Sequence, residues 1–188
     1  MRLSPTPRPP RLTRSGLILA VYSALALVAI AWAAWRGRAM ALFVPGLGVG
    51  RMLVGLAWGV AATALVVFAS RWATHRLEWA RIIEREFRDV LGPLGGSEIF
   101  ILAAASSLGE ELFFRGALVP EVGLIGSSLL FALPHIGPGV RFLPWTATSF
   151  VVGLGFGAIA IHSGSLLGPI AAHFLINLLN LRRITRPR

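Results

Sequence analysis

The chain has 188 residues, of which 55% are hydrophobic and 14% are charged, and its mean hydropathy is +0.73. A soluble domain of this size could not bury so much apolar surface, so the composition excludes an ordinary soluble globular protein and favours one embedded in a bilayer. The net charge is +10, but the arginines cluster at the ends of apolar stretches, a pattern typical of membrane topology signals rather than of a nucleic-acid-binding surface. Cysteine is absent, which excludes disulfides, a thiolate nucleophile and cysteine-based metal sites.

The N-terminal part of the chain divides into an arm, two apolar segments and one amphipathic segment. Residues 1–14 are rich in proline and arginine and predict a disordered, basic cytoplasmic arm. Residues 15–35 and 52–70 are long and apolar enough to be membrane-spanning helices. Residues 71–92 interleave charged and apolar side chains at helical spacing, which predicts an amphipathic helix lying on the membrane surface. We therefore expect residues 15–92 to form two transmembrane helices and an interfacial helix.

The C-terminal part contains the remaining apolar segments. They predict a four-helix core within residues 95–181, followed by a basic cytoplasmic tail at residues 182–188. The helices expected in this core span residues 97–118, 124–136, 144–161 and 165–181. The whole sequence therefore predicts an all-α, polytopic membrane protein with about six transmembrane helices and one interfacial helix.

The distribution of arginine predicts the orientation in the membrane. With the N-terminus in the cytoplasm, fourteen of the 18 basic residues, all of them arginine, fall on the cytoplasmic side, and Arg36, Arg38 and Arg51 fall on the other. The last one, Arg115, lies inside an apolar helix. Because short cytoplasmic loops are enriched in arginine, we expect both termini in the cytoplasm. The absence of lysine, with abundant alanine, glycine and proline, suggests a GC-rich bacterial genome and hence the bacterial cytoplasmic membrane.

Three charged residues interrupt an apolar helix in the stretch GEELFFRG. A charge at the centre of a bilayer costs about 2.5–3.5 kcal/mol on insertion scales, so such side chains are expected to face protein or water and to compensate one another. Glu111 and Arg115 are four residues apart and share a helix face, which predicts an ion pair. Glu110 lies about 100° around the helix from Glu111, which leaves it free for a different task.

Two later helices carry polar side chains at a similar depth. His135 follows Phe131 by one turn, and His173 and Asn177 share one face of the last helix. Glu110 and His135 each lie about 12–15 Å from a helix end at 1.5 Å per residue, so the three helices can bring these groups together. A desolvated glutamate beside a histidine can act as a general base, and a second histidine with an amide can stabilise an oxyanion. Two histidines and a carboxylate could instead hold zinc.

The order of these motifs on successive helices resembles a known family. The motifs are Glu110-Glu111-x-x-x-Arg115, Phe131-x-x-x-His135 and His173-x-x-x-Asn177. This set is similar to that of the CAAX-protease and bacteriocin-processing (CPBP, or Abi) intramembrane endopeptidases, which include the type II CAAX prenyl endopeptidases. The resemblance covers about residues 95–181 and implies a helical intramembrane protease.

The resemblance also implies roles for the polar side chains. Glu110 and His135 would activate the water, His173 and Asn177 would stabilise the oxyanion, and the charged pair of the first motif would support the site. Zinc stays an alternative, but the chain has no HExxH motif to place ligands rigidly on one helix, which favours a metal-free mechanism.

Three classes of function are compatible with the sequence. The first is an endopeptidase that cleaves a membrane-associated or lipidated protein or peptide by C-terminal processing. The second is a proton-coupled membrane transporter, because buried glutamate, histidine and arginine also form proton relays. The third is a non-catalytic scaffold or immunity protein that retains the fold. We expect the lipid bilayer and a membrane-embedded or lipidated substrate as partners, and no nucleic acid.

Overall fold

The computed structural model describes residues 14–44 and 46–186, and within these ranges the backbone forms helices but no strand. The elements are α1 (Arg14–Trp35), η1 (Ala39–Leu42), α2 (Gly48–Arg76), α3 (Glu78–Leu91), α4 (Gly96–Glu110), η2 (Glu111–Leu118), α5 (Val119–Ala132), η3 (Leu133–His135), η4 (Val140–Phe142), α6 (Leu143–Ser163) and α7 (Leu167–Ile184). The segment η2 is a π-helix, and the other η segments are 3-10 helices. The expected all-α fold is confirmed for the described part of the chain.

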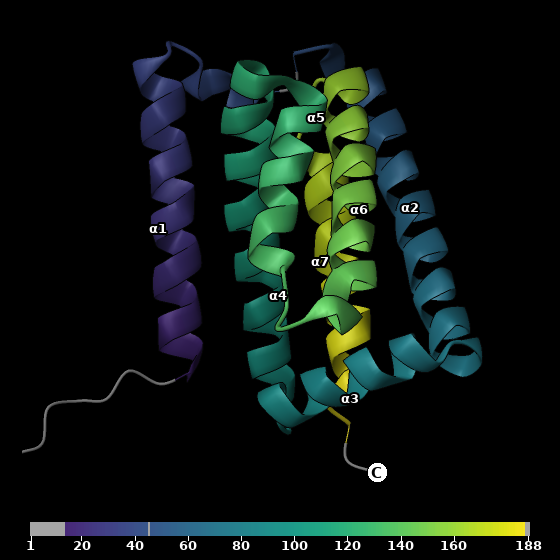
Figure 1. Ribbon diagram of the computed structural model, residues 1–188. Helices are drawn as coiled ribbons and strands as arrows, with labels where there is room; N and C mark the ends of the chain where they lie inside the picture. Colours follow the sequence, from purple (N-terminus) through teal and green to yellow (C-terminus); the bar gives the residue numbers. More distant parts are fainter. Residues whose placement is uncertain (1–13, 45, 187–188) are drawn as a thin grey trace, which may run out of the picture.

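The chain is a polytopic membrane protein. Among the described residues, 4 stretches are long and apolar enough to cross a bilayer. They are Arg14–Trp35, Gly48–Arg76, Gly96–His135 and Val140–Ser163. The third has 40 residues, whereas about 20 are enough to cross the hydrocarbon core. This stretch folds back on itself at Gly123, which has a φ of 73° and a ψ of 176°, a conformation that only glycine adopts easily. The rest of α5 then runs back beside η2 (Figure 1).

The amphipathic helix α3 lies across one end of the bundle (Figure 1). The sequence predicts the start of this interfacial segment at residue 71, but α2 continues to Arg76 and α3 begins only at Glu78. No glycine or proline interrupts residues 70–77, so α2 continues into the charged region until the extended backbone of Leu77 ends it. The change in side-chain polarity therefore does not coincide with the end of the helix.

The end of α7 packs against α3. The Arg183 Nη1 atom donates a hydrogen bond of 2.7 Å to Glu84 Oε2, and Arg88 Nε donates one of 2.8 Å to the carbonyl of Ile184. Residues 182–184, predicted to belong to a tail, are thus the last turn of α7, because these contacts with α3 keep the turn helical.

Both ends of the described chain lie at the end of the bundle that carries α3 (Figure 1). At the start of α1, Arg14 Nη1 donates a hydrogen bond of 2.7 Å to the carbonyl of Leu91, the last residue of α3. The predicted arm, except for Arg14, and the last two residues of the predicted tail lie outside the described residues.

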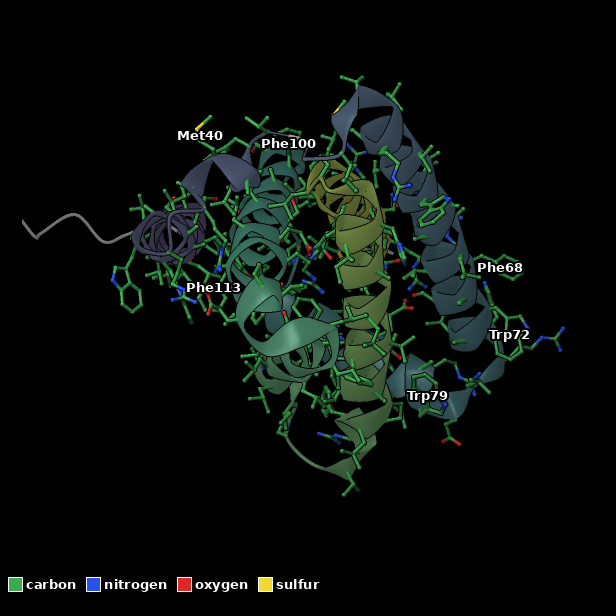
Figure 2. All side chains as sticks on the ribbon, turned by 90° about the horizontal axis from the view of Figure 1, so that it is seen from above. Met40, Phe68, Trp72, Trp79, Phe100 and Phe113 are labelled. Atoms are coloured by element: carbon green, nitrogen blue, oxygen red, sulfur yellow. The ribbon has the colours of Figure 1, made fainter. Side chains whose placement is uncertain are left out.

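Large apolar side chains cover the outside of the bundle. Figure 2, a view along the bundle, shows Phe68 and Trp72 on α2 pointing away from the other helices. They are 69% and 51% exposed. Apolar side chains on an outer face are expected where that face contacts lipid chains instead of water.

Small residues bring α2, α6 and α7 into close contact. A Cβ atom added at Gly59 of α2 would collide with the backbone of Gly168 in α7, and one added at Gly55 would collide with Ser163 of α6. Such small-residue contacts are typical of helix packing in membranes. They hold α7, which carries His173 and Asn177, at a fixed distance from the rest of the bundle.

We expect Gly59→Ala to lower the free energy of unfolding by about 1–3 kcal/mol, because the new methyl group would force α2 and α7 apart. Gly155→Ala is the matched control, since Gly155 lies in helix α6 and a Cβ there would meet nothing within 4 Å. This control should be neutral or stabilising by up to about 1 kcal/mol, because alanine has the higher helix propensity. Denaturation in detergent micelles measures both values. Equal stabilities of the two variants would contradict the close contact.

Candidate active site

The charged stretch GEELFFRG lies where α4 changes from an α-helix to the π-helix η2. The π-helix begins at Glu111 and includes Arg115. A π-helix is rare and is frequent at functional sites, because its wider turn changes which side chains share a face. Here the two adjacent glutamates both approach His173 of α7, one on each ring nitrogen.

Glu111 is the anionic centre of a buried network. Its side chain is 0% exposed, and its Oε1 atom accepts hydrogen bonds from Arg115 Nη1 at 3.0 Å and from His173 Nδ1 at 2.7 Å. The predicted pairing of Glu111 with Arg115 is therefore found. A carboxylate that accepts two such bonds is held in place and is a poor candidate for a group that must take up a proton.

Arg115 is enclosed by aromatic rings and backbone. Its guanidinium carbon lies 4.2 Å from the ring centre of Phe131, and Nη2 donates a hydrogen bond of 3.4 Å to the carbonyl of Gly153. A cation this close to an aromatic face gains a cation–π interaction, which is strongest away from water. Arg115 thus links η2 to α5 and α6.

Glu110 has a different environment from Glu111. Its side chain is 14% exposed, and its Oε2 atom lies 3.9 Å from His173 Nε2, too far for a hydrogen bond. This oxygen is buried and has no hydrogen-bond partner among the described residues. Glu111 Oε2 is likewise buried without a partner among these residues, but the Glu111 side chain is 0% exposed and is fixed through Oε1. Glu110 is therefore the glutamate that a water molecule or a substrate can reach.

His135 approaches the same region from the end of α5. Pro134 lies in the short 3-10 helix η3 that follows α5, and His135 is its last residue. The Nδ1 atom of His135 lies 2.8 Å from the carbonyl of Phe131. A carbonyl only accepts hydrogen bonds, so Nδ1 carries the proton and Nε2 keeps a lone pair in the neutral ring. The ring centres of His135 and His173 lie 4.8 and 6.1 Å from that of Phe131, so both histidines pack around this ring.

Asn177 forms a hydrogen bond with Ser106, a residue that the sequence analysis did not identify as its partner. Its Nδ2 atom donates a hydrogen bond of 3.0 Å to Ser106 Oγ, one turn from Glu110 on α4. The helices α4 and α7 run in opposite directions. One turn of each helix therefore separates the Ser106–Asn177 contact from the Glu110–His173 contact. In the sequence, the i, i+4 spacing of Ser106 and Glu110 indicates only that both residues lie on one face of a helix. Spacing alone does not identify a partner on another helix.

The structure thus brings five predicted residues into one connected region. Glu110 and Glu111 flank His173, Arg115 is linked to them through Glu111, and His135 packs on the Phe131 ring that His173 also contacts. Asn177 lies one turn farther along α7 and is bonded to Ser106 of α4.

A metal ion would need several ligands that converge. Among the described residues, no three histidine, aspartate or glutamate side chains are arranged to hold a metal ion. His173 Nδ1 is bonded to Glu111 and His135 Nδ1 to a carbonyl. The side chains in this arrangement do not fit a zinc site with three protein ligands.

Comparison with known proteins relates the C-terminal part of the bundle to a family. Residues 96–179 match the family model described as Type II CAAX prenyl endopeptidase Rce1-like. The uncharacterized protein YpbD of Bacillus subtilis (strain 168) is 35% identical over 82 residues, which cover 42% of this chain and 41% of YpbD. The chain therefore spans about 41% of the length of this curated relative. No solved structure matches the chain significantly.

The matched segment runs from the start of α4 almost to the end of α7 and contains every residue of the three motifs. The family resemblance of the sequence is thereby confirmed for this segment. Residues 96–179 of this membrane protein are a domain of the Rce1-like type II CAAX prenyl endopeptidase family.

Proposed function

We propose that the chain is an intramembrane endopeptidase in which Glu110, assisted by His135, activates a water molecule. The observation that carries this proposal is the difference between the two adjacent glutamates. Both have an Oε2 atom without a partner among the residues described. Glu111 is 0% exposed and is held by Arg115 and His173 through Oε1, whereas Glu110 is 14% exposed and only approaches His173, at 3.9 Å. A partly buried carboxylate next to imidazoles is suited to general-base catalysis.

The proposed reaction is direct hydrolysis. A water molecule between Glu110 and His135 loses a proton to Glu110 as its oxygen attacks the carbonyl carbon of the peptide. The tetrahedral intermediate collapses when the C–N bond breaks and Glu110 returns the proton to the leaving nitrogen. The products are a new C-terminal carboxyl group and a new amine, so atoms and protons balance without a covalent enzyme intermediate.

The oxyanion of the intermediate requires hydrogen-bond donors. His173 uses Nδ1 toward Glu111, so its Nε2 atom can donate only when the ring carries both protons. The Asn177 amide has a second N–H besides the one directed at Ser106.

We propose a membrane-associated or lipidated protein or peptide as the substrate. The family description names CAAX prenyl endopeptidases, and the site lies within a bundle whose outer face is apolar. Such a surface gives access to a chain segment that is itself held in the bilayer.

The test uses the purified chain in proteoliposomes, with a farnesylated peptide that ends in a CAAX sequence and its unprenylated form as probes. In water enriched in ¹⁸O, direct hydrolysis incorporates one labelled oxygen into the new C-terminal carboxyl group. We expect labelled product from the wild type and none from Glu110→Gln. Cleavage that persists in Glu110→Gln would refute the proposed base. Cleavage of the unprenylated probe alone would exclude a farnesylated peptide as the substrate.

We further propose six membrane-spanning segments with both termini in the cytoplasm, in a bacterial cytoplasmic membrane. Four apolar stretches become six segments when Gly96–His135 is divided into two at Gly123 and α7, which has 18 residues, is added. It puts α3 on the cytoplasmic side and η1 on the opposite side, in agreement with the arginine distribution.

Single cysteines can test this orientation, because the natural chain has no cysteine. Met40 in η1 and Val90 in α3 are 70% and 78% exposed. We expect a membrane-impermeant maleimide to label Met40→Cys in intact spheroplasts, and to label Val90→Cys only after permeabilisation. The reverse pattern would invert the proposed orientation.

A further inference from the structure

The chain contains a single tyrosine, Tyr22, and it lies in α1, outside the segment that matches the family. Tyr22, Ala26, Ala29 and Ala33 follow one another at intervals of four, three and four residues, so they share one face of α1. Ala29 and Ala33 are 0% and 1% exposed and pack in a cluster with Leu112 and Ala117 of η2. The stripe that contains Tyr22 is thus the face of α1 that packs against α4 and η2.

Tyr22 meets α4 immediately before Glu110. A Cβ atom added at Gly109 would lie 2.7 Å from the carbonyl oxygen of Tyr22 and 3.1 Å from its Cβ atom. Glycine at this position therefore allows the backbones of the two helices to approach closely. Gly109 is the residue next to Glu110, so the Tyr22 side chain leaves α1 at the level of Glu110, which places the phenol within reach of the Glu110 carboxylate.

The two groups are chemically complementary. An ionised carboxylate accepts hydrogen bonds and donates none, whereas a phenol can donate one. Glu110 has a buried oxygen without a partner in the described part of the chain, and an unpaired buried acceptor is unfavourable. The ring of His173, 3.9 Å from Glu110 Oε2, is used by the proposed mechanism for the substrate.

We propose that Tyr22 is a positioning residue whose hydroxyl donates a hydrogen bond to the Glu110 carboxylate and orients it toward His135 and His173. This inference rests on the proposed function, because it assigns Tyr22 a role through the proposed base. It makes α1 part of the active site, although the family match begins only at residue 96. Tyr22 contacts Glu110 and not the reacting atoms.

The contact can be tested without any substrate. Because the chain has one tyrosine, growth with 3-fluorotyrosine places a single ¹⁹F label at residue 22 of the full-length protein. We expect Glu110→Gln to shift this ¹⁹F resonance, since the mutation replaces the charged acceptor by a neutral amide. Glu98→Gln is the control, because Glu98 lies twelve residues earlier on α4, about 18 Å along the helix axis, and should leave the resonance unchanged. A resonance that is identical in the wild type and Glu110→Gln would overturn the proposal.

The role in positioning has its own measurement. Tyr22→Phe removes only the hydroxyl, and we expect it to slow the appearance of Glu110-dependent C-termini in cells by about tenfold or more, the size of effect typical of a hydrogen bond to a charged group. Ser23→Ala is the control, because it removes a hydroxyl from the exposed neighbouring position on α1. In this variant the Glu110-dependent C-termini should appear at the wild-type rate.

Three outcomes are distinguishable. A shifted resonance together with slow processing by Tyr22→Phe supports the proposal. A shifted resonance with wild-type processing by Tyr22→Phe, while Glu110→Gln is inactive, overturns the positioning role but not the proposed function. Wild-type processing by Glu110→Gln overturns the proposed function, and Tyr22 is then only a packing contact.

Discussion

Replacement of Glu110 by glutamine is expected to lower the rate of proteolysis by about 100-fold or more and to leave the fold intact, because a general base contributes about 10²–10⁴-fold to a rate. Glutamine has nearly the same shape as glutamate but cannot take up the proton of the attacking water. Glu110 Oε2 has no hydrogen-bond partner within the described ranges, so the mutation leaves few other groups unpaired. The rate of C-terminal product formation and the denaturation midpoint in detergent measure the two effects.

Glu86→Gln is the matched control for the loss of one carboxylate. Glu86 pairs with Arg141 at 3.0 Å, and both side chains are partly exposed. The control should retain wild-type activity and stability. Loss of activity in Glu110→Gln accompanied by an equal loss of folded protein would assign Glu110 to structure instead of catalysis.

Replacement of Arg115 by methionine is expected to destabilise the protein strongly, by about 3–5 kcal/mol, because it leaves the Glu111 carboxylate buried without its cation. The side chains of Arg115 and Glu111 are 1% and 0% exposed, so water cannot replace the lost partner. Methionine retains most of the volume that packs against Phe131, which limits the loss of contacts. Denaturation in detergent micelles measures the change.

The double variant Glu111→Gln, Arg115→Met separates charge from packing. We expect it to be more stable than Arg115→Met alone, because it no longer buries an unpaired charge. Arg141→Gln breaks an exposed ion pair and should cost less than about 1 kcal/mol. If Arg115→Met were no more costly than Arg141→Gln, Glu111 would not depend on Arg115 as its counter-ion.

Local patterns in the sequence predict the helices and the ion pair of Glu111 with Arg115. Apolar segments of spanning length predict most of the helices, because the bilayer selects length and hydropathy directly. The i, i+4 spacing predicts the ion pair, because both residues lie on one helix face. The end of α2 was predicted six residues too early, since a change from apolar to charged side chains does not end a helix.

The rest of the site depends on contacts between helices that are distant in the sequence. Ser106 and Asn177 are 71 residues apart in the sequence and form a hydrogen bond. Tyr22 packs next to Glu110, although the sequence of α1 predicts only an apolar membrane-spanning helix. Neither contact follows from spacing along one helix. The π-helix η2, which lets both glutamates approach His173, likewise depends on how α4 and η2 pack against α1 and α7.

The most direct test of the central claim compares the membrane proteomes of cells that carry the wild type or Glu110→Ala at equal protein levels, with C-terminal and N-terminal peptides mapped by mass spectrometry. If the chain is a protease with Glu110 as its base, a defined set of new termini is present with the wild type and absent with the variant, and those termini identify the substrates. Identical termini in the two strains, together with a phenotype on deletion of the whole protein, would contradict proteolysis and assign the charged cluster to helix packing or proton transfer.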